Sequence, residues 1–386
     1  MVDVFRKSCL ANSASSVSTA EPDENNRLKW PPLGICESWM RDFDSFNLLS
    51  FSLLDLERFE FDHVLRPSSA LWKAQIEVHL DRRVGSKVVA KRFFRAYLKD
   101  SPVDFRKAKS GGSEDPWSEL FLALKLGKHL PGPGVLPCHG IFIHPSGDVM
   151  VMMEYATCGD LFDLAGCLGE PGPPREVLAV QLLRSLLRAV RFLHHEVGIA
   201  HGDISLENVL LRDRPDSTGG PDVALLDFAR AVCHGASARA EVRRHIGAGD
   251  MYRPPEGWCV DARRADLFAC GVVGYVLAIG TYPWQSTRGC KAFEYVKKNG
   301  LARFFQKRTV PVGSAQVPVA ELLSPRLQAA LMALLDVDSF HCSELCEMLL
   351  DGLLMEQRAQ PLETEPATPL SRCFGGVFFV VKCLVR

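Results

Sequence analysis

The sequence lacks an excess of charge of either sign. Among its 386 residues, 45 are lysine or arginine and 46 are aspartate or glutamate, so the formal net charge is −1. A near-neutral chain has no overall field with which to hold nucleic acid or an anionic membrane, and neither partner is expected without a local patch. Hydrophobic residues make up 47% and charged residues 24% of the chain, and this balance excludes global disorder.

Closely paired cysteines are also missing. The 13 cysteines are scattered from Cys9 to Cys383, and no two of them form a CxxC pair. The odd number and the scatter indicate reduced thiols rather than a disulfide framework. Cys342 and Cys346 have helical spacing but lack the further ligands of a zinc site, so no such site is predicted.

Long apolar runs are absent as well. No segment reaches the roughly 18 apolar residues that a membrane helix requires, and the first residues contain no apolar core of a secretory signal. Residues 374–386 are apolar but short, and they are compatible with a late strand, a weak membrane-surface anchor or an artefact of gene prediction. We expect no transmembrane segment and an intracellular, cytoplasmic location.

Changes in composition along the chain divide it into regions. The start is rich in serine, alanine and acidic residues, which predicts disorder. The apolar stretch from Trp39 to Phe61 predicts a helix leading into a folded domain. The expected regions are a disordered leader at 1–28, an N-terminal extension at 29–60, a folded domain at 61–355 with lobes at 61–155 and 156–355, and a tail at 356–386.

The first lobe has the pattern of strands and the second has the pattern of helices. Apolar and polar residues alternate strictly from Trp72 to Leu80, which predicts a half-buried strand joined to the next strand by a turn at Arg82–Gly85. Leucine and valine recur at helical spacing over 182–193. The predicted fold class is α+β. Other expected strands are 61–65, 140–145 and 149–155, and other expected helices are 119–129, 266–279, 290–300, 324–336 and 343–355.

The most informative residues lie between His201 and Ala229. HGDISLENVLL contains Asp203 and Asn208, and LLDFA contains Asp227 after an apolar strand. This order suits phosphoryl transfer, which needs positioned charges around phosphates and Mg²⁺ more than covalent help. Asp203 would orient the attacking hydroxyl and accept its proton, while Asn208 and Asp227 would hold Mg²⁺ through hard oxygen ligands.

Each of these residues also has a structural interpretation. Asp203 could form a turn, Asn208 could cap a loop, and Asp227 could be a buried carboxylate with satisfied hydrogen bonds. The occurrence of all three in this order favours the functional interpretation.

HGDISLEN resembles the catalytic loop of protein kinases, and LLDFA resembles their metal-binding segment. The resemblance extends from Trp72 to Leu354 and includes RPPE, which ends at Glu256. It implies a bilobal protein-kinase-like fold, ATP with Mg²⁺ or Mn²⁺ as cofactors, and transfer of the γ-phosphoryl group to serine or threonine hydroxyls of protein substrates.

The resemblance also implies roles for residues outside the catalytic loop. Lys91 in VVAK corresponds to the lysine that binds the phosphates, and Glu119 would be its partner on the following helix. Asp266 would brace the backbone of the catalytic loop. The segment MMEYATCGDLF resembles a hinge whose nucleotide-binding positions are Met153 as gatekeeper, Glu154 and Ala156 through backbone groups to adenine, and Asp160 near the ribose.

The sequence departs from the family pattern at several positions. No glycine lies between Leu65 and Leu71, where kinases have a glycine-rich loop, and Cβ atoms and Pro67 keep backbone amides away from phosphates. The nucleotide would then be held by Lys91, the acidic residues and the hinge, with the hydroxyls of Ser68 and Ser69 as further candidates. Gly202 replaces an arginine that pairs with a phosphorylated activation loop. The other departures are Ser205 for a lysine, Ala229 for a glycine, Gly249 for a threonine, and Phe340–Cys342 where an arginine commonly holds Glu256.

These departures leave two kinds of function open. The intact set of Lys91, Asp203, Asn208 and Asp227 favours an active serine/threonine kinase. The missing loop and the substitutions at Ser205 and Gly249 favour a pseudokinase scaffold that binds partners with little or no phosphotransfer. Phosphorylation of a small molecule is less favoured, because the helical lobe retains the segments that support a peptide substrate.

Overall fold

The chain divides into two units, Met1–Pro32 and Leu33–Arg386. The computed structural model describes part of the second unit, namely residues 39, 42–43, 45–69, 73–108, 114–212, 222–233, 249–255, 262–336 and 351. The predicted leader, the tail, the pair Cys342 and Cys346, Glu256 and all but one residue of the predicted helix at 343–355 lie outside the described residues.

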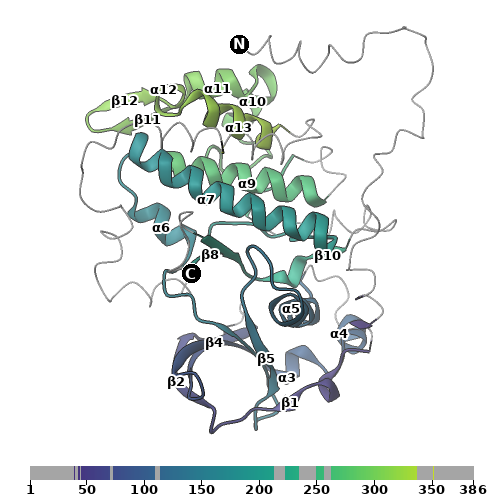
Figure 1. Cartoon of the computed structure of the whole chain (residues 1–386). Helices are drawn as coiled ribbons and strands as arrows, with labels where there is room; N and C mark the ends of the chain where they lie inside the picture. The colour runs from purple at the N-terminus through teal and green to yellow at the C-terminus, as the bar shows by residue number, and fades with distance from the viewer. Residues whose placement is uncertain are drawn as a thin grey trace, which may run out of the picture. The chain divides into compact units, whose positions relative to one another are not determined.

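A six-stranded sheet with the order β1-β5-β6-β4-β3-β2 forms the N-terminal lobe (Figure 1). Neighbouring strands are antiparallel, except that β1 runs parallel to β5. The predicted hairpin is confirmed, since Asp81 pairs with Ser86 across the turn. The strands are β1 (Ser52–Leu53), β2 (Phe59–Arg66), β3 (Ala74–Asp81), β4 (Ser86–Phe93), β5 (Cys138–Ile143) and β6 (Val149–Glu154).

Strand β3 is buried on both faces, so the prediction of a half-buried strand is wrong. Glu77 and His79, on its polar face, are only 2% and 3% exposed. Arg92 on the neighbouring strand donates to Glu77 at 3.2 Å, and Arg58 donates to the carboxylate of Asp81 at 2.8 Å. Buried charges are tolerated when they are paired in this way, and the partners come from other strands and turns.

The helix predicted from Trp39 to Phe61 is wrong beyond Phe43. Asn47 caps a short 3₁₀ turn, η1 (Leu48–Ser50), by accepting from Leu49 N at 2.9 Å, and the chain then continues into β1 and β2. Phe43, Phe46 and Phe51 of the segment pack on helix α5 (Pro116–Leu124). Their ring centroids lie 5.1–6.1 Å from those of Trp117 and Phe121.

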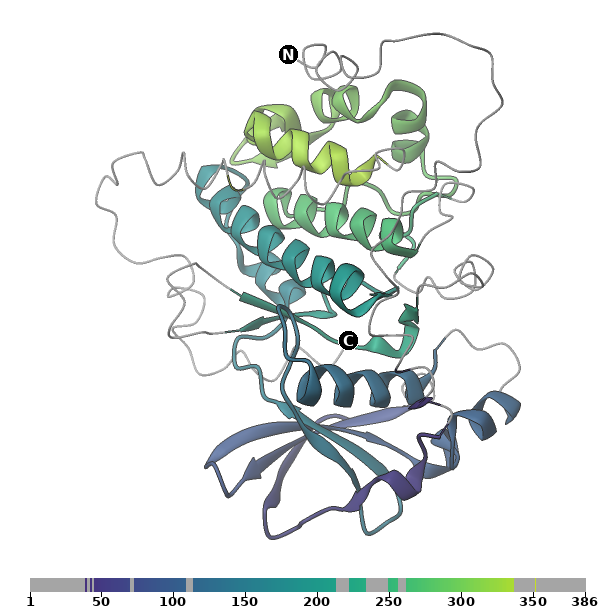
Figure 2. The ribbon, with the colours of Figure 1, turned by 45° about the vertical axis from the view of Figure 1, so that its right-hand side comes forward.

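Helix α5 lies between the sheet and the helical lobe (Figure 2). Asp115 caps it by accepting from Trp117 N at 3.0 Å, and Pro116 fits the first turn because proline has no N–H to leave unpaired. A π-helical turn, η2 (Lys125–His129), continues α5, so the helix predicted at 119–129 is confirmed with an earlier start. The short helices α3 (Arg95–Leu98) and α4 (Pro102–Ala108) precede it.

The C-terminal lobe is built on helices α7 (Pro173–Arg191) and α9 (Ala262–Ile279), which lie side by side (Figure 2). The leucine stripe of α7 is fully buried, as predicted. A Cβ atom on Gly274 of α9 would lie 2.7 Å from Leu183 of α7, so glycine permits the close approach of these helices. The remaining helices are α6 (Leu161–Cys167), η3 (Phe192–Val197), η4 (Phe228–Arg230), α10 (Lys291–Asn299), α11 (Leu301–Lys307), α12 (Val319–Leu322) and α13 (Pro325–Leu335).

Among the residues that the structure describes, three two-stranded ribbons complete the lobe, and two of them flank the catalytic-loop residues. Strands β8 (Val209–Arg212) and β9 (Asp222–Leu225) pair with each other, as do β7 (Ile199–Ala200) and β10 (Val232–Cys233). These pairs bring the segment that starts at His201 next to the segment that contains Asp227. The third ribbon, β11 (Thr309–Val312) with β12 (Ala315–Pro318), lies further along the chain.

The structure bears on the expectations about membrane helices and cysteines. No helix within the described ranges is long and apolar enough to cross a membrane. Cys138, Cys158 and Cys290 are free, in keeping with reduced thiols. Cys233 is disulfide-bonded, so the expectation of reduced thiols is wrong at this position.

Candidate active site

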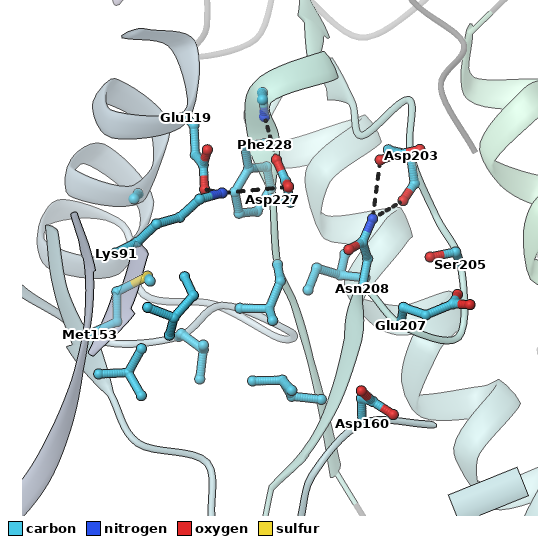
Figure 3. Close-up of a pocket in the computed structure, with 18 of the residues that line it drawn as sticks. Lys91, Glu119, Met153, Asp160, Asp203, Ser205, Glu207, Asn208, Asp227 and Phe228 are labelled. Atoms are coloured by element: carbon cyan, nitrogen blue, oxygen red, sulfur yellow. Dashed lines mark hydrogen bonds and ion pairs between the residues drawn. The ribbon is translucent and has the colours of Figure 1, made fainter. Parts of the chain in front are cut away.

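A cavity of about 640 Å³ is lined by strands β2–β4 and α5 on one side and by the hinge and catalytic-loop residues on the other (Figure 3). This volume is in the range of small-molecule and nucleotide sites. All nine site residues predicted from the sequence line the cavity, and they are Lys91, Glu119, Met153, Glu154, Ala156, Asp160, Asp203, Asn208 and Asp227.

Lys91 lies at the centre of a buried group of charges. Its Nζ donates to Glu119 Oε1 at 2.5 Å and to Asp227 Oδ2 at 3.5 Å. Burial alone would lower the pKa of Lys91, but the carboxylates of Asp227 and Glu119 outweigh it and raise the pKa. The ammonium group is therefore charged at physiological pH.

The two carboxylates around Lys91 respond differently to their surroundings. Burial, together with the charge of Asp227, raises the pKa of Glu119 to about 7 although Lys91 opposes the shift. The pKa of Asp227 is lowered: burial would raise it, but Lys91 and the amide of Ala229 stabilise the carboxylate more strongly. Asp227 is therefore the carboxylate that remains ionised under all physiological conditions.

Asp227 has a backbone conformation that is uncommon outside glycine, with φ at 64°. Aspartate tolerates this left-handed region because its short side chain bonds locally, here by accepting from Ala229 N at 3.3 Å. Leu226 N donates to Asn208 O at 2.9 Å and ties the two segments together. The turn after β9 thereby directs the carboxylate of Asp227 toward Lys91 (Figure 3).

Asp203 and Asn208 lie within one short loop and contact each other. Asn208 Nδ2 donates to the backbone oxygen of Asp203 at 2.8 Å and to its Oδ2 at 3.2 Å. Burial raises the pKa of Asp203 to about 7; Arg230 acts against this rise, while Asp227 and Glu114 add to it. The hydrogen bond from Asn208 thus orients the side chain of Asp203, which lies near both positive and negative charges.

The backbone of the catalytic loop is held by Asp266 of α9, as the resemblance implies. Asp266 accepts from His201 N at 2.7 Å and from Gly202 N at 2.9 Å, and its Oδ2 also lies 2.8 Å from His194 Nε2. His201 Nε2 donates to Leu226 O at 2.9 Å. His201 therefore holds the backbone and His194 supports Asp266, and neither histidine lines the cavity.

The oxygen atoms of Asn208 and Asp227 fit a hard divalent cation. Asn208 directs its amide nitrogen at Asp203, which leaves Oδ1 as its acceptor, and Figure 3 shows the amide between Asp203 and Asp227. Mg²⁺ is held in proteins by one or two such ligands together with water and substrate phosphates. No cluster of three or more His, Cys, Asp or Glu side chains that could hold a metal ion occurs among the residues that the structure describes.

Sequence reasoning missed several residues that line the cavity. Arg66 and Lys73 line it at the position of the missing glycine-rich loop, whereas Ser68 and Ser69 do not. Burial lowers the pKa of Arg66, and the carboxylate of Asp227 acts in the opposite direction. No local pattern marks these two cations, because a charge beside a strand end is common on any protein surface.

The apolar part of the lining was equally unmarked in the sequence. Ile76 of β3, Val89 of β4 and Leu210 of β8 line the cavity together with Met153. Strand alternation places Ile76 on the inward face, but only the tertiary fold brings the side chains of the sheet strands together with Leu210 of the separate β8–β9 ribbon. They make the hinge side of the cavity suitable for a flat apolar ring.

The family model of the protein kinase domain matches residues 105–359, which is more than half of the chain. The chain belongs to the protein kinase family. The predicted family and the predicted bilobal α+β fold are thus confirmed. Strands β2–β4, which carry Arg66 and Lys91, precede the matched residues and nevertheless complete the kinase sheet.

Several curated kinases are similar to the chain over part of its length. It is 30% identical over 184 residues to mouse testis-specific serine/threonine-protein kinase 3, covering 46% of this chain and 64% of that protein. It is 30% identical over 213 residues to the rice putative CBL-interacting protein kinase 27, covering 54% of this chain and 46% of that protein. It is also 30% identical over 209 residues to serine/threonine-protein kinase cds1 from Schizosaccharomyces pombe, covering 51% of this chain and 42% of that protein. The chain therefore spans less than two thirds of the length of these relatives.

Proposed function

We propose that this kinase-family chain is an active serine/threonine protein kinase that uses ATP and Mg²⁺ to phosphorylate protein substrates. The observation that carries the proposal is the meeting of Lys91, Asp203, Asn208 and Asp227 in one cavity. Lys91 and Asp227 are 136 positions apart in the sequence, yet they are hydrogen-bonded. The names of the related serine/threonine kinases support the same choice of acceptor hydroxyl.

Different parts of the cavity lining suit the adenine ring, the ribose and the phosphates of ATP. Ile76, Val89 and Leu210 offer apolar surface to the adenine ring, next to the backbone of Glu154 and Ala156. Asp160 lies at the hinge end, where it would accept from a ribose hydroxyl (Figure 3).

The phosphates would be met by side chains rather than by backbone amides. Lys91 is charged and fixed by Glu119 and Asp227, and Arg66 and Lys73 line the cavity at the place of the glycine-rich loop. Guanidinium and ammonium groups bind phosphate oxygens through charge-assisted hydrogen bonds. The missing glycines thus remove a particular kind of phosphate contact but leave the positive charge that phosphates require.

The transfer itself depends on where the carboxylates lie. Asp203, held by Asn208, would orient the substrate hydroxyl and accept its proton. Asn208 Oδ1 and the carboxylate of Asp227 would hold Mg²⁺, which when bound neutralises charge on the phosphate oxygens. Lys91 keeps the carboxylate of Asp227 oriented toward the same space.

The alternative function is a pseudokinase scaffold. It is favoured by the missing glycines and by Ser205, which lines the cavity where a lysine would neutralise the transferring group. The loss of one such charge costs on the order of 3 kcal/mol at the transition state, by analogy with oxyanion donors. A scaffold of this kind would bind ATP or a partner without turnover.

Phosphate transfer from γ-labelled ATP to the chain itself and to a protein mixture distinguishes the two functions. Assays with Mg²⁺, with Mn²⁺ and with a chelator would be run on the wild type, on Asp203→Asn and on the exposed control Asp62→Asn. We expect Asp203→Asn to lower transfer by about 1,000-fold while thermal stabilisation by ATP is kept. Equal turnover in wild type and Asp203→Asn would contradict the proposal. Stabilisation by ATP without transfer by the wild type would favour the scaffold.

A further inference from the structure

Arg230, at the end of η4, connects two parts of the site that are distant in sequence. Its Nη2 donates to Glu114 Oε1 at 2.7 Å, and its Nε lies 3.8 Å from Asp203 Oδ2. The side chain is only 15% exposed. The guanidinium group therefore lies between the residue that precedes the cap of α5 and the carboxylate of the catalytic loop.

The backbone around Arg230 is as closely packed as its side chain. Gly202 has φ at 78°, and a Cβ atom on it would lie 2.5 Å from the carbonyl oxygen of Arg230, closer than real Cβ atoms come. Asp115 N donates to Ala229 O at 2.8 Å, so the start of α5 is bonded to the same segment. A glycine beside Asp203 thus makes room for the backbone that carries Arg230.

Arg230 is the positive charge beside Asp203, whose other charged neighbours are carboxylates. Asp227 and Glu114 are the carboxylates that act on Asp203, and Asn208 is its hydrogen-bonding neighbour. Lys91 is bonded to Glu119 and Asp227 instead. Within the described parts of the chain, Arg230 is the cation in ion-pair distance of Asp203. Ser205, two residues further along, carries no charge.

We propose that Arg230 is the positioning residue for Asp203 in phosphate transfer. Glu114 holds the guanidinium group, and the guanidinium group holds the carboxylate of Asp203 toward the incoming hydroxyl; we call these three residues the Arg230 bridge. The bridge also links the segment that leads into α5, and with it Glu119, to the catalytic loop. It consists of side chains of this chain alone and forms without any added phosphate. The inference rests on the proposed kinase function.

Steady-state kinetics of Arg230 variants test the bridge. Arg230→Ala is expected to lower kcat by about 100-fold, because a small misplacement of a catalytic group has an effect of this size. The KM for ATP should stay within about twofold, since the nucleotide contacts lie on other residues. Arg230→Lys should recover kcat to within about tenfold of the wild type, because a flexible ammonium group still reaches one carboxylate.

Arg82→Ala is the matched control, because Arg82 also pairs with a glutamate, Glu60 at 3.0 Å, but is 56% exposed on a distant turn. Its kcat should equal that of the wild type. A kcat of Arg230→Ala within twofold of the wild type would overturn the inference. It would also be overturned if Arg230→Lys lost as much activity as Arg230→Ala while both melted at lower temperature, since that result describes a structural role only.

Failure of the proposed function would be recognised separately. If the wild type transfers no phosphate at all, the kinase proposal fails, and the bridge is then judged by thermal unfolding of Arg230→Ala, Glu114→Ala and the double variant. If Arg230 and Glu114 are coupled, the double variant should melt close to the melting temperature of Arg230→Ala. Melting losses of the single variants that simply add up would overturn the bridge.

Discussion

Except for Glu114 and Glu119 at the start of helix α5, the two walls of the cavity carry opposite charges. The strand wall, formed by β2–β4, contributes the cations Arg66, Lys73 and Lys91. The loop wall, formed by the hinge and the segments around Asp203 and Asp227, contributes carboxylates. One wall is suited to phosphate oxygens and the other to a metal ion and an attacking hydroxyl, so the division of charge follows the division of chemical tasks.

The walls also differ in how strictly their residues are required. The loop wall is held by buried hydrogen bonds from Asp266 and from Tyr252, whose hydroxyl accepts from Leu206 N at 3.2 Å. It needs oxygen atoms at fixed places, and the chain retains them. The strand wall needs positive charge near the phosphates, which several different side chains supply. This difference explains why a kinase can lose the glycines of one wall and keep the acids of the other.

Among the variants that compare the two walls, the largest effect is expected at Lys91, where the walls meet. Lys91→Met should lower kcat/KM by about 100-fold or more, because it removes a preorganised charge and leaves Glu119 and Asp227 without their shared cation. Phosphate transfer at varied ATP concentration measures this change. Lys87→Met on the same strand is the control, since Lys87 is 51% exposed and pairs with Asp62. Equal losses in the two variants would contradict the assigned role of Lys91.

A smaller effect is expected from the cation that stands at the place of the glycine-rich loop. Arg66→Ala should raise the KM for ATP by about tenfold and leave kcat nearly unchanged, because the guanidinium group would bind phosphate in ground state and transition state alike. Arg83→Ala, at a 68% exposed arginine of the strand lobe, is the control. An unchanged KM in Arg66→Ala would show that the strand wall binds phosphate through Lys91 and Lys73 without Arg66.

The smallest effect is expected at Asp160 of the loop wall and concerns stability. Burial raises the pKa of Asp160 to about 7. An unfolded aspartate titrates near 3.9, so the neutral form stabilises the fold below about pH 4 and this contribution is lost as the pH rises through about 7. Asp160→Asn cannot ionise. Its side-chain oxygen can still accept from Asp163 N, which lies 2.9 Å from Asp160 Oδ1 in the wild type.

Thermal melting of Asp160→Asn against the wild type measures this contribution. The variant should gain about 2 °C more over the wild type at pH 8 than at pH 5. A gain that does not depend on pH would mean that Asp160 is ionised at both pH values. The loop wall would then tolerate its carboxylate without cost.

The acidic part of the site could be predicted from the sequence because its members lie close together along the chain. Asp203 and Asn208 share one loop, and Asp227 follows a single strand pair, so local spacing indicates their chemistry. The ion pair of Lys91 with Glu119 needed the family resemblance, because 28 positions separate the two residues. Arg66, Arg230 and Glu114 could not be predicted, since their partners lie in distant segments.

The sequence by itself determined that a strand-rich lobe precedes a helical one and predicted the residues of phosphoryl transfer, because periodicity and spacing are local properties. Only the tertiary structure decided which polar groups are buried. Glu77 and His79 look like a solvent-facing strand edge and are covered, and the phenylalanines near Asn47 look helical and instead pack on α5. Burial and ion pairing depend on partners contributed by remote segments, and those partners also set the pKa of Asp160 and the place of Arg230.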